Sequence, residues 1–152
     1  VDEKYKITPY ERKVLLAWNT FLQHFKENNI KMCSPVLVDE FGATYDYSEY
    51  QDWKQKYCET NRKLYIENKD FIDKWLLEFE VKGFKKRDRK FEWQAGKNTL
   101  SVYDSLIQLR QSGVRCKKTD TFPALVAIVQ TSIVGKYERR IKSIKFFIYN
   151  NI

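Results

Sequence analysis

The chain has 152 residues, which suits one domain, and 43% of them are hydrophobic, which argues against a wholly disordered chain. No apolar run reaches the roughly 18 residues of a membrane-spanning helix, and no apolar leader precedes a small-residue cleavage site, so we expect no membrane partner. Three widely spaced cysteines (Cys33, Cys58 and Cys116) argue against a disulfide framework and favour a cytoplasmic protein.

Charge divides the chain into two unlike halves. Residues 1–80 hold 12 Lys/Arg against 15 Asp/Glu, a net charge of −3, whereas residues 81–152 hold 16 against 5, a net charge of +11. The basic half points to a polyanion such as nucleic acid as its partner. From charge alone, a basic surface that only aids solubility is an equal alternative.

The first predicted helix begins with a complete start signal. Thr8 can cap it, Pro9 suits its first position, and Glu11 completes a capping box. Apolar residues then recur at three- and four-residue spacing, which predicts one buried face. These residues are Val14, Leu15, Trp18, Phe21, Leu22 and Phe25. Asn28-Asn29 is the expected end of the helix.

Two more helices are expected before residue 84. After a loop through Ser34-Pro35 and a short apolar stretch at 36–38, a second helix is expected from Ser48. Its apolar side would consist of Tyr50, Trp53, Tyr57 and Leu64. A third helix follows Asn68 and stops at Gly83. Its inward residues would be Phe71, Ile72, Trp75, Leu76 and Phe79. Aromatic side chains at helical spacing are core residues far more often than base-stacking surfaces, so we interpret both stripes as core.

Basic loops and short strands are predicted after this point. The segment 83–90 is a basic loop without apolar periodicity. Residues 89–94 alternate in character, which predicts a short strand that runs to a turn at 95–98.

A hairpin and a buried strand complete the predicted elements. Residues 106–110 and 114–118 flank Gln111-Ser112-Gly113, which predicts two strands joined at a glycine turn with basic side chains along one face. The continuous apolar run 124–129 predicts a fully buried strand. We therefore expect an α+β fold, in which a helical N-terminal half packs with a small, mainly antiparallel β C-terminal half.

Signals for catalysis are missing from the sequence. The lone His24 and the three cysteines include no pair with the close spacing of a zinc site, so we expect no metal. No phosphate-binding glycine loop, nucleophile elbow or paired-histidine motif occurs. The carboxylates of residues 39–80 are explained more simply as solvated helix faces than as acid–base catalysts. We expect no catalytic residue.

Several blocks of the basic half carry a family resemblance. In chain order they read RKFEWQAG at 89–96, SLIQLRQSGVR at 105–115, DTFPALVA at 120–127 and QTSIVG at 130–135. Over residues 84–141, their order and spacing resemble the variable recognition region and ninth shared motif of bacterial and phage DNA (cytosine-5)-methyltransferases. Pro9–Arg12, Ala17-Trp18 and Asp39–Tyr45 are similar to the same branch but less distinctive.

The resemblance implies a division of labour between two domains. In that family, which serves restriction–modification, a large domain holds S-adenosylmethionine and a catalytic cysteine within Pro-Cys. A small domain reads bases in the major groove while the target cytosine is flipped out. This chain resembles the small domain plus the ninth motif, so the implied partners are double-stranded DNA, at the nucleoid, and a separate catalytic chain. Pro-Cys and the cofactor motifs are missing, so we expect no methyl transfer and no S-adenosylmethionine binding by this chain alone.

The resemblance also predicts the organisation of the chain. We expect one recognition-like domain over 1–152, mainly helical over 1–83 and basic and β-rich over 84–141. Where the family continues Thr-Pro-Arg-Glu, this chain has an atypical Lys/Asn/Ile/Phe tail, 142–152, of the kind a frameshift or premature end in an A/T-rich gene yields. We expect this tail to pack loosely or in a way foreign to the family.

Two sets of residues are candidates for DNA contact. Phosphate contacts are expected from Lys85, Lys86, Arg87, Arg89, Lys117 and Lys118. Base edges are expected to be read by the residues at the glycine turn, where the family carries a recognition loop. These residues are Arg110, Gln111, Ser112 and Arg115. For each, a solvated or structural role is an equal alternative, and Arg115 in particular can serve only to brace the domain.

Two functions are compatible with this sequence. In the first, the chain binds double-stranded DNA as the target-recognition portion of a split or truncated methyltransferase. In the second, it is a non-catalytic protein-interaction module or an inactive remnant that no longer binds DNA.

Overall fold

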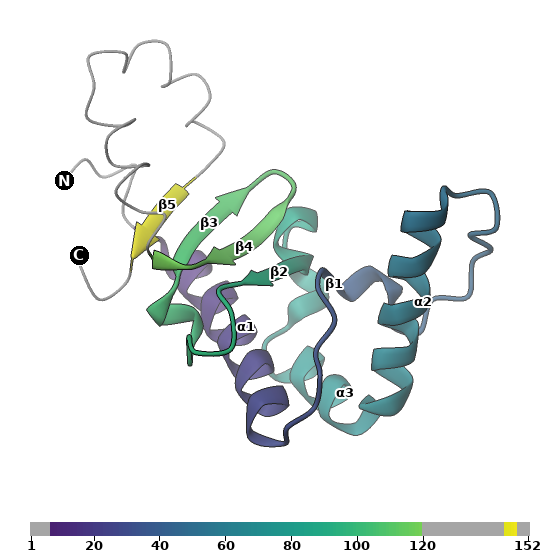
Figure 1. Cartoon of the computed structure of the whole chain (residues 1–152), viewed down its shortest axis with the longest axis horizontal. Coiled ribbons are helices and arrows are strands. Elements are labelled where there is room, and N and C mark those ends of the chain that lie inside the picture. The colour runs from purple at the N-terminus through teal and green to yellow at the C-terminus, as the bar shows by residue number, and fades with distance from the viewer. Residues whose placement is uncertain (1–6, 120–144, 149–152) are drawn as a thin grey trace, which may run out of the picture.

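The computed structural model describes residues 7–119 and 145–148. The predicted buried strand at 124–129 and the resemblance blocks after residue 119 lie outside these ranges. Figure 1 shows a group of helices on one side and a small twisted sheet on the other, with α1 running against the sheet. Within the described ranges, no helix combines the length and apolar character needed to cross a membrane.

Helix α1 (Pro9–Glu27) confirms the first predicted helix in its start, its buried face and its end. The Thr8 side chain accepts a hydrogen bond from the Glu11 backbone N–H at 3.1 Å, and the Glu11 carboxylate accepts one from the Thr8 N–H at 2.9 Å. The predicted apolar residues are all buried. Asn28 is the C-cap, and Asn29 has a positive φ of 54°.

The described residues form a five-stranded sheet with the order β1-β2-β4-β3-β5. The strands are β1 (Val36–Leu37), β2 (Lys90–Gln94), β3 (Leu106–Arg110), β4 (Gly113–Lys117) and β5 (Lys145–Ile148). Strands β2 and β4 are parallel, and the other three neighbouring pairs are antiparallel. The predicted α+β class, the strand at 89–94 and the hairpin around the glycine turn are therefore confirmed.

The hydrophobic core joins the helices to one face of the sheet. The indole of Trp18 on α1 stacks on Phe91 of β2, with ring centroids 4.8 Å apart and planes 6° apart. The same indole lies 5.0 Å from that of Trp75. Residues at alternate positions of β3 and β4, such as Ile107 and Val114, belong to this core. One apolar cluster therefore contains residues from both the acidic and the basic half.

Helix α2 (Asp52–Glu67) begins later than the predicted Ser48 and buries a different face. Of the predicted apolar stripe, Leu64 is buried. The stripe residues exposed to solvent are Tyr50, Trp53 and Tyr57. The interpretation of these three aromatic residues as core was therefore wrong.

A buried asparagine explains this orientation. Asn61 has no exposed surface and faces β1 from the inner side of α2. Its Oδ1 accepts a hydrogen bond from the Leu37 N–H at 2.7 Å, and its Nδ2 donates to the Pro35 carbonyl at 3.1 Å and the Tyr57 carbonyl at 2.9 Å. An unpaired buried amide costs about 1–3 kcal/mol. Satisfying these groups holds the helix in a rotation that turns the aromatic residues outward.

Helix α3 (Lys69–Glu78) follows directly and buries most of its predicted face. Ile72, Trp75, Leu76 and Phe79 are buried. The predicted stop at Gly83 was wrong, because the helix ends at Glu78 and the left-handed backbone lies at Glu80 (φ 53°). Gly83 instead closes a short 3₁₀ turn, Val81–Gly83.

Part of the atypical tail belongs to the sheet. The backbone of β5 pairs antiparallel with β3, so that Leu106 lies opposite Ile148 and Leu109 lies opposite Lys145. The backbone of these four residues is therefore part of the sheet, and the expected packing of the tail stays a prediction. Three further 3₁₀ turns, Val38–Glu40, Lys86–Arg89 and Val102–Asp104, connect the main elements.

Candidate nucleic-acid interface

The parallel pairing of β2 and β4 brings two distant basic segments together. Parallel strands begin at the same edge of a sheet, so the loop before β2 and the turn before β4 are neighbours. Gly113 permits the close approach, since its φ is 131° and a Cβ there would lie 3.0 Å from the Lys90 Cβ and 3.2 Å from the Lys90 carbonyl oxygen. Only glycine fits this position without strain.

An open depression of about 510 Å³ lies where these segments meet. Its lining consists of Lys85, Lys86, Arg87, Lys90 and Gln111. Four of these five residues were predicted to contact DNA, three through phosphate and one through a base edge. The fifth, Lys90, was not among the predicted contacts, although it ends the basic run that begins at Lys85. We call this site the basic depression.

Tyr10 and Trp18 of α1 fix the loop that carries most of the lysines. The Tyr10 hydroxyl donates to Asp88 Oδ2 at 2.6 Å and accepts from the Lys85 backbone N–H at 2.8 Å. The Trp18 Nε1 donates to the Asp88 carbonyl at 2.9 Å. Burial, followed by the hydrogen bond to Asp88, raises the pKa of Tyr10 to about 12. Asp88 is 2% exposed, whereas Lys85 and Lys86 are exposed. The hydrogen bonds from Tyr10 and Trp18 thus hold Asp88 inside the protein and leave the two lysine side chains facing outward.

The two arginines of this loop differ in how strongly they are held. The Arg87 Nε lies 3.5 Å from Asp88 Oδ1, and this buried atom makes no hydrogen bond. Arg89 is firmly held, since its Nε lies 2.7 Å from Asp39 Oδ1 and its Nη1 donates to the Phe84 carbonyl at 2.7 Å. Arg87 lines the basic depression, whereas Arg89 ties the loop to residue 39.

An acidic side chain from the neighbouring strand β2, which was not predicted as part of the site, lies against the predicted basic face of the hairpin. Glu92 of β2 accepts from Arg115 Nε at 2.8 Å and from Arg110 Nη2 at 3.4 Å. The Arg110 side chain is 16% exposed, and burial followed by repulsion from Arg115 lowers its pKa. Gln111 and Ser112 are exposed at the turn. Both arginines therefore brace three neighbouring strands, as the structural alternative for Arg115 anticipated.

Lys117 and Lys118 lie away from the basic depression. Lys117 ends β4 opposite Gln94, and a Cβ on Gly96 would lie 3.1 Å from the Lys118 Cε. The strand separates Gly113 from Lys117 by about 13 Å at the usual rise per residue. The structure thus divides the predicted phosphate contacts between two ends of β4.

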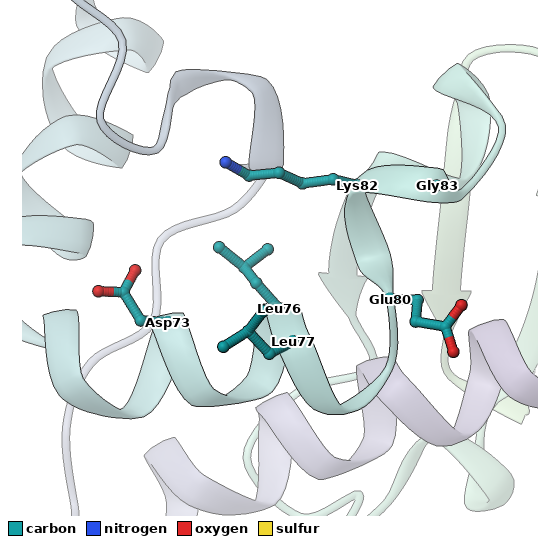
Figure 2. Close-up of a pocket in the computed structure, with 6 residues that line it drawn as sticks. All are labelled: Asp73, Leu76, Leu77, Glu80, Lys82 and Gly83. Atoms are coloured by element: carbon teal, nitrogen blue, oxygen red, sulfur yellow. The ribbon is translucent and has the colours of Figure 1, made fainter.

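A second depression has a different character. It has a volume of about 570 Å³ and lies beside the end of α3 (Figure 2). Two leucines, two acidic residues and one lysine line it. The lining is Asp73, Leu76, Leu77, Glu80, Lys82 and Gly83. This mixture does not complement a polyanion.

The lone histidine has a packing role. The ring of His24 stacks on Phe71 at 3.6 Å, and burial lowers its pKa. Among the residues that the structure describes, no three His, Cys, Asp or Glu side chains gather as a metal site. Cys33, Cys58 and Cys116 carry free thiols, and burial raises the pKa of each.

A comparison with known proteins relates part of the chain to a methyltransferase. A stretch of 91 residues, 59% of the chain, is 37% identical to the type II methyltransferase M.AluI of Cellulosimicrobium cellulans. The match spans 17% of that protein, so this chain corresponds to about a sixth of its relative's length. No protein-family profile matches the chain. No solved structure matches it either.

Proposed function

We propose that the chain binds double-stranded DNA as the target-recognition portion of a split or truncated DNA (cytosine-5)-methyltransferase. Similarity to a type II methyltransferase supports a methylation-related role. On this proposal, S-adenosylmethionine and the catalytic cysteine belong to a methyltransferase part outside these 152 residues, and these residues transfer no methyl group alone.

The basic depression is the observation that carries the proposal. The lysine and arginine side chains of the loop at 85–87 line the depression together with Lys90, the first residue of β2, and Gln111 of the hairpin turn. This is the edge of the sheet at which β2 and β4 both begin. Cations neutralise DNA phosphates, and an amide side chain can pair with base edges in the major groove. The basic depression therefore combines cationic side chains that can bind phosphates with an exposed amide side chain, Gln111.

The distances suggest different roles for the predicted residues. Lys85, Lys86, Arg87 and Lys90 contact phosphates on this proposal, and Gln111 with Ser112 reaches the bases. Glu92 holds Arg110 and Arg115 within the sheet, so these arginines support the hairpin.

Salt-dependent binding to duplex DNA tests the proposal. Three to five neutralised phosphates give a log–log salt slope of about −3 to −5, with affinity near the micromolar range. Replacing Lys85, Lys86 and Arg87 together by glutamine should weaken binding to all sequences and flatten the slope. A matched variant with Lys56, Lys63 and Lys74 of the helical half replaced by glutamine should keep the wild-type slope. Absence of binding at roughly 50 mM salt and tens of micromolar protein would overturn the proposal.

Calorimetry tests the assignment of cofactor binding to a part outside these residues. The isolated chain should show no saturable heat with S-adenosylmethionine. Micromolar cofactor binding with a defined stoichiometry would contradict this assignment and leave the DNA-binding proposal intact.

A further inference from the structure

Helix α2 exposes its largest aromatic residue. Trp53 is 56% exposed and Tyr57 is 36% exposed, whereas the buried positions of the helix are Cys58, Asn61 and Leu64. Tyr45 and Tyr50, which precede the helix, are also exposed, and we call these four exposed rings the aromatic ridge. It consists of Tyr45, Tyr50, Trp53 and Tyr57. Exposed clusters of tryptophan and tyrosine are typical of binding surfaces.

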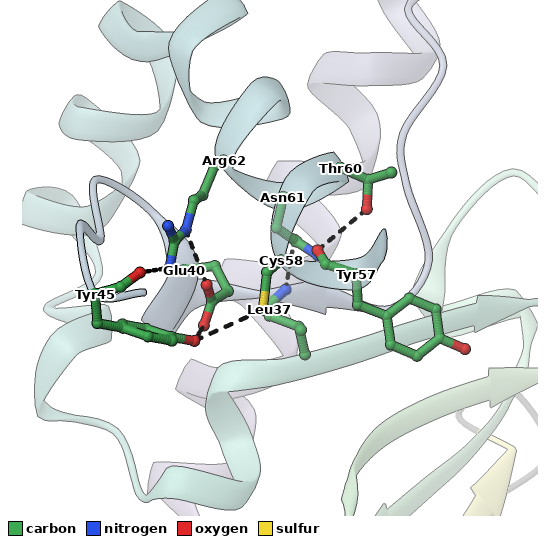
Figure 3. Close-up of polar contacts among 8 residues, drawn as sticks. All are labelled: Leu37, Glu40, Tyr45, Tyr57, Cys58, Thr60, Asn61 and Arg62. Carbon is green, nitrogen blue, oxygen red and sulfur yellow. Dashed lines mark hydrogen bonds and ion pairs between the residues drawn. The ribbon is translucent and has the colours of Figure 1, made fainter. Parts of the chain in front are cut away.

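A partly buried ion pair fastens the segment of Tyr45 to α2 (Figure 3). Glu40 accepts from Arg62 Nε at 3.1 Å and from the Tyr45 hydroxyl. Arg62 Nη2 also donates to the Tyr45 carbonyl at 3.1 Å, and its guanidinium lies 4.6 Å from the ring centres of both Tyr45 and Tyr47. Tyr57 points away from this cluster in the same view. The segment before α2 is thus fastened to the helix at several points.

The exposed rings are ordered by their own contacts. Tyr45 and Tyr50 meet edge to face with centroids 6.3 Å apart, and Trp53 and Tyr57 meet edge to face at 5.6 Å. The Trp53 Nε1 donates to Gln51 Oε1 at 2.6 Å. Side chains that are already ordered lose little conformational entropy on binding. The ridge is therefore a preorganised surface.

Charge determines which class of partner fits. Residues 45–60 contain four carboxylates against two lysines, Lys54 and Lys56. The ammonium of Lys54 lies over the Tyr50 ring at 4.1 Å. The carboxylates are those of Asp46, Glu49, Asp52 and Glu59, all exposed. This net negative charge repels phosphates, so it disfavours a nucleic acid as the occupant.

We propose that the aromatic ridge is a docking surface for a protein partner that presents arginine side chains. Guanidinium groups stack on indole and phenol rings and pair with carboxylates, and exposed groups of both kinds alternate along residues 45–60. Because the ridge lies on α2 and the segment before it, whereas the basic depression lies beside β2 and β4, the two partners would use different surfaces. This inference does not depend on the proposed DNA binding.

Calorimetry of the whole chain with a short synthetic peptide tests the proposal. The probe alternates arginine with leucine, and the control peptide has glutamate in place of arginine. The arginine peptide should bind, and the glutamate peptide should not. Trp53→Ala should weaken binding about tenfold or more. Ile66→Ala, which removes an exposed side chain elsewhere on α2, should leave binding unchanged. Circular dichroism confirms that both variants fold.

Several outcomes overturn the proposal. Equal binding of the two peptides, an unchanged affinity of Trp53→Ala, or no saturable binding at millimolar peptide would each contradict it. If sedimentation showed the wild-type chain as a dimer and Trp53→Ala as a monomer, the ridge would be assigned to a second copy of the chain instead. If single-stranded oligothymidine competed with the arginine peptide for the wild-type chain, and Trp53→Ala abolished oligothymidine binding, the ridge would be assigned to nucleic acid.

Discussion

Helices α1 and α2 both carry aromatic residues at helical spacing, but they place them on opposite sides. On α1, Trp18, Phe21 and Phe25 are buried against the sheet and α3. On α2, Trp53 and Tyr57 face solvent, and a polar side chain, Asn61, occupies the buried position. The rule that periodic aromatic residues are core residues holds for the first helix and fails for the second.

Hydrogen bonding explains the difference between the two helices. The interior side of α1 meets apolar side chains, so its apolar face turns inward. The interior side of α2 meets the backbone around residues 35–37, which needs donors and acceptors. An asparagine satisfies that backbone better than any aromatic ring. Amphipathic pattern therefore determines a helix orientation only where the neighbouring surface is apolar.

Tryptophan-to-alanine substitutions should separate the two helices most clearly. Trp18→Ala removes a fully buried indole and leaves a cavity, so we expect it to lower the free energy of unfolding by about 3–5 kcal/mol. Trp53→Ala should change it by no more than about 0.5 kcal/mol. Urea unfolding measures both values. Equal destabilisation by the two variants would contradict the exposed position of Trp53.

Removing Asn61 should break the contact that orients α2. Asn61→Ala removes the acceptor of the Leu37 N–H and the amide donor to the Pro35 carbonyl, so we expect a loss of about 2–3 kcal/mol. Thr60→Ala is the matched control, because the Thr60 hydroxyl donates only to the Tyr57 carbonyl of its own helix. A neutral Asn61→Ala would mean that another contact sets the rotation of α2.

Tyr10→Phe should test the anchor of the basic loop. It removes the hydrogen bonds to Asp88 and from Lys85, so we expect a loss of about 1–2 kcal/mol near neutral pH. The pKa of Tyr10 is raised in the folded state from 10.0 to about 12, so its stabilising effect is complete below pH 10 and is lost as the pH rises toward 12.

The difference in stability between wild type and Tyr10→Phe should therefore shrink over this pH range. Urea unfolding at a series of alkaline pH values measures it. A difference that stays constant or grows above pH 10 would exclude Tyr10 as the titrating group.

Thr8→Ala should have a smaller effect than Trp18→Ala, Asn61→Ala or Tyr10→Phe, because it acts at the exposed start of α1. Losing the hydroxyl that accepts from the Glu11 N–H should cost about 1 kcal/mol. Thr8→Ser keeps the acceptor and should retain most of that stability. If both variants lost the same amount, the capping box would not be the source.

Much of the candidate site was predictable, but its assembly was not. The basic run from Lys85 and the glycine turn at Gly113 were visible in the sequence, and both contribute to the basic depression. Glu92 escaped prediction as a brace, although it stands in the alternating stretch before the turn. Its importance depends on Arg110 and Arg115, which reach it from two other strands.

The sequence by itself determined the features that depend on neighbouring residues: the capped start of α1, its buried face, the short strands and the hairpin. Such features follow from backbone preferences and periodicity within a few residues. Only the tertiary structure decided that β2 and β4 pair in parallel, that Gln111 and Lys85 line one depression, and that α2 turns Trp53 outward. These outcomes depend on hydrogen bonds and close contacts between residues far apart in the chain, and local patterns do not encode them.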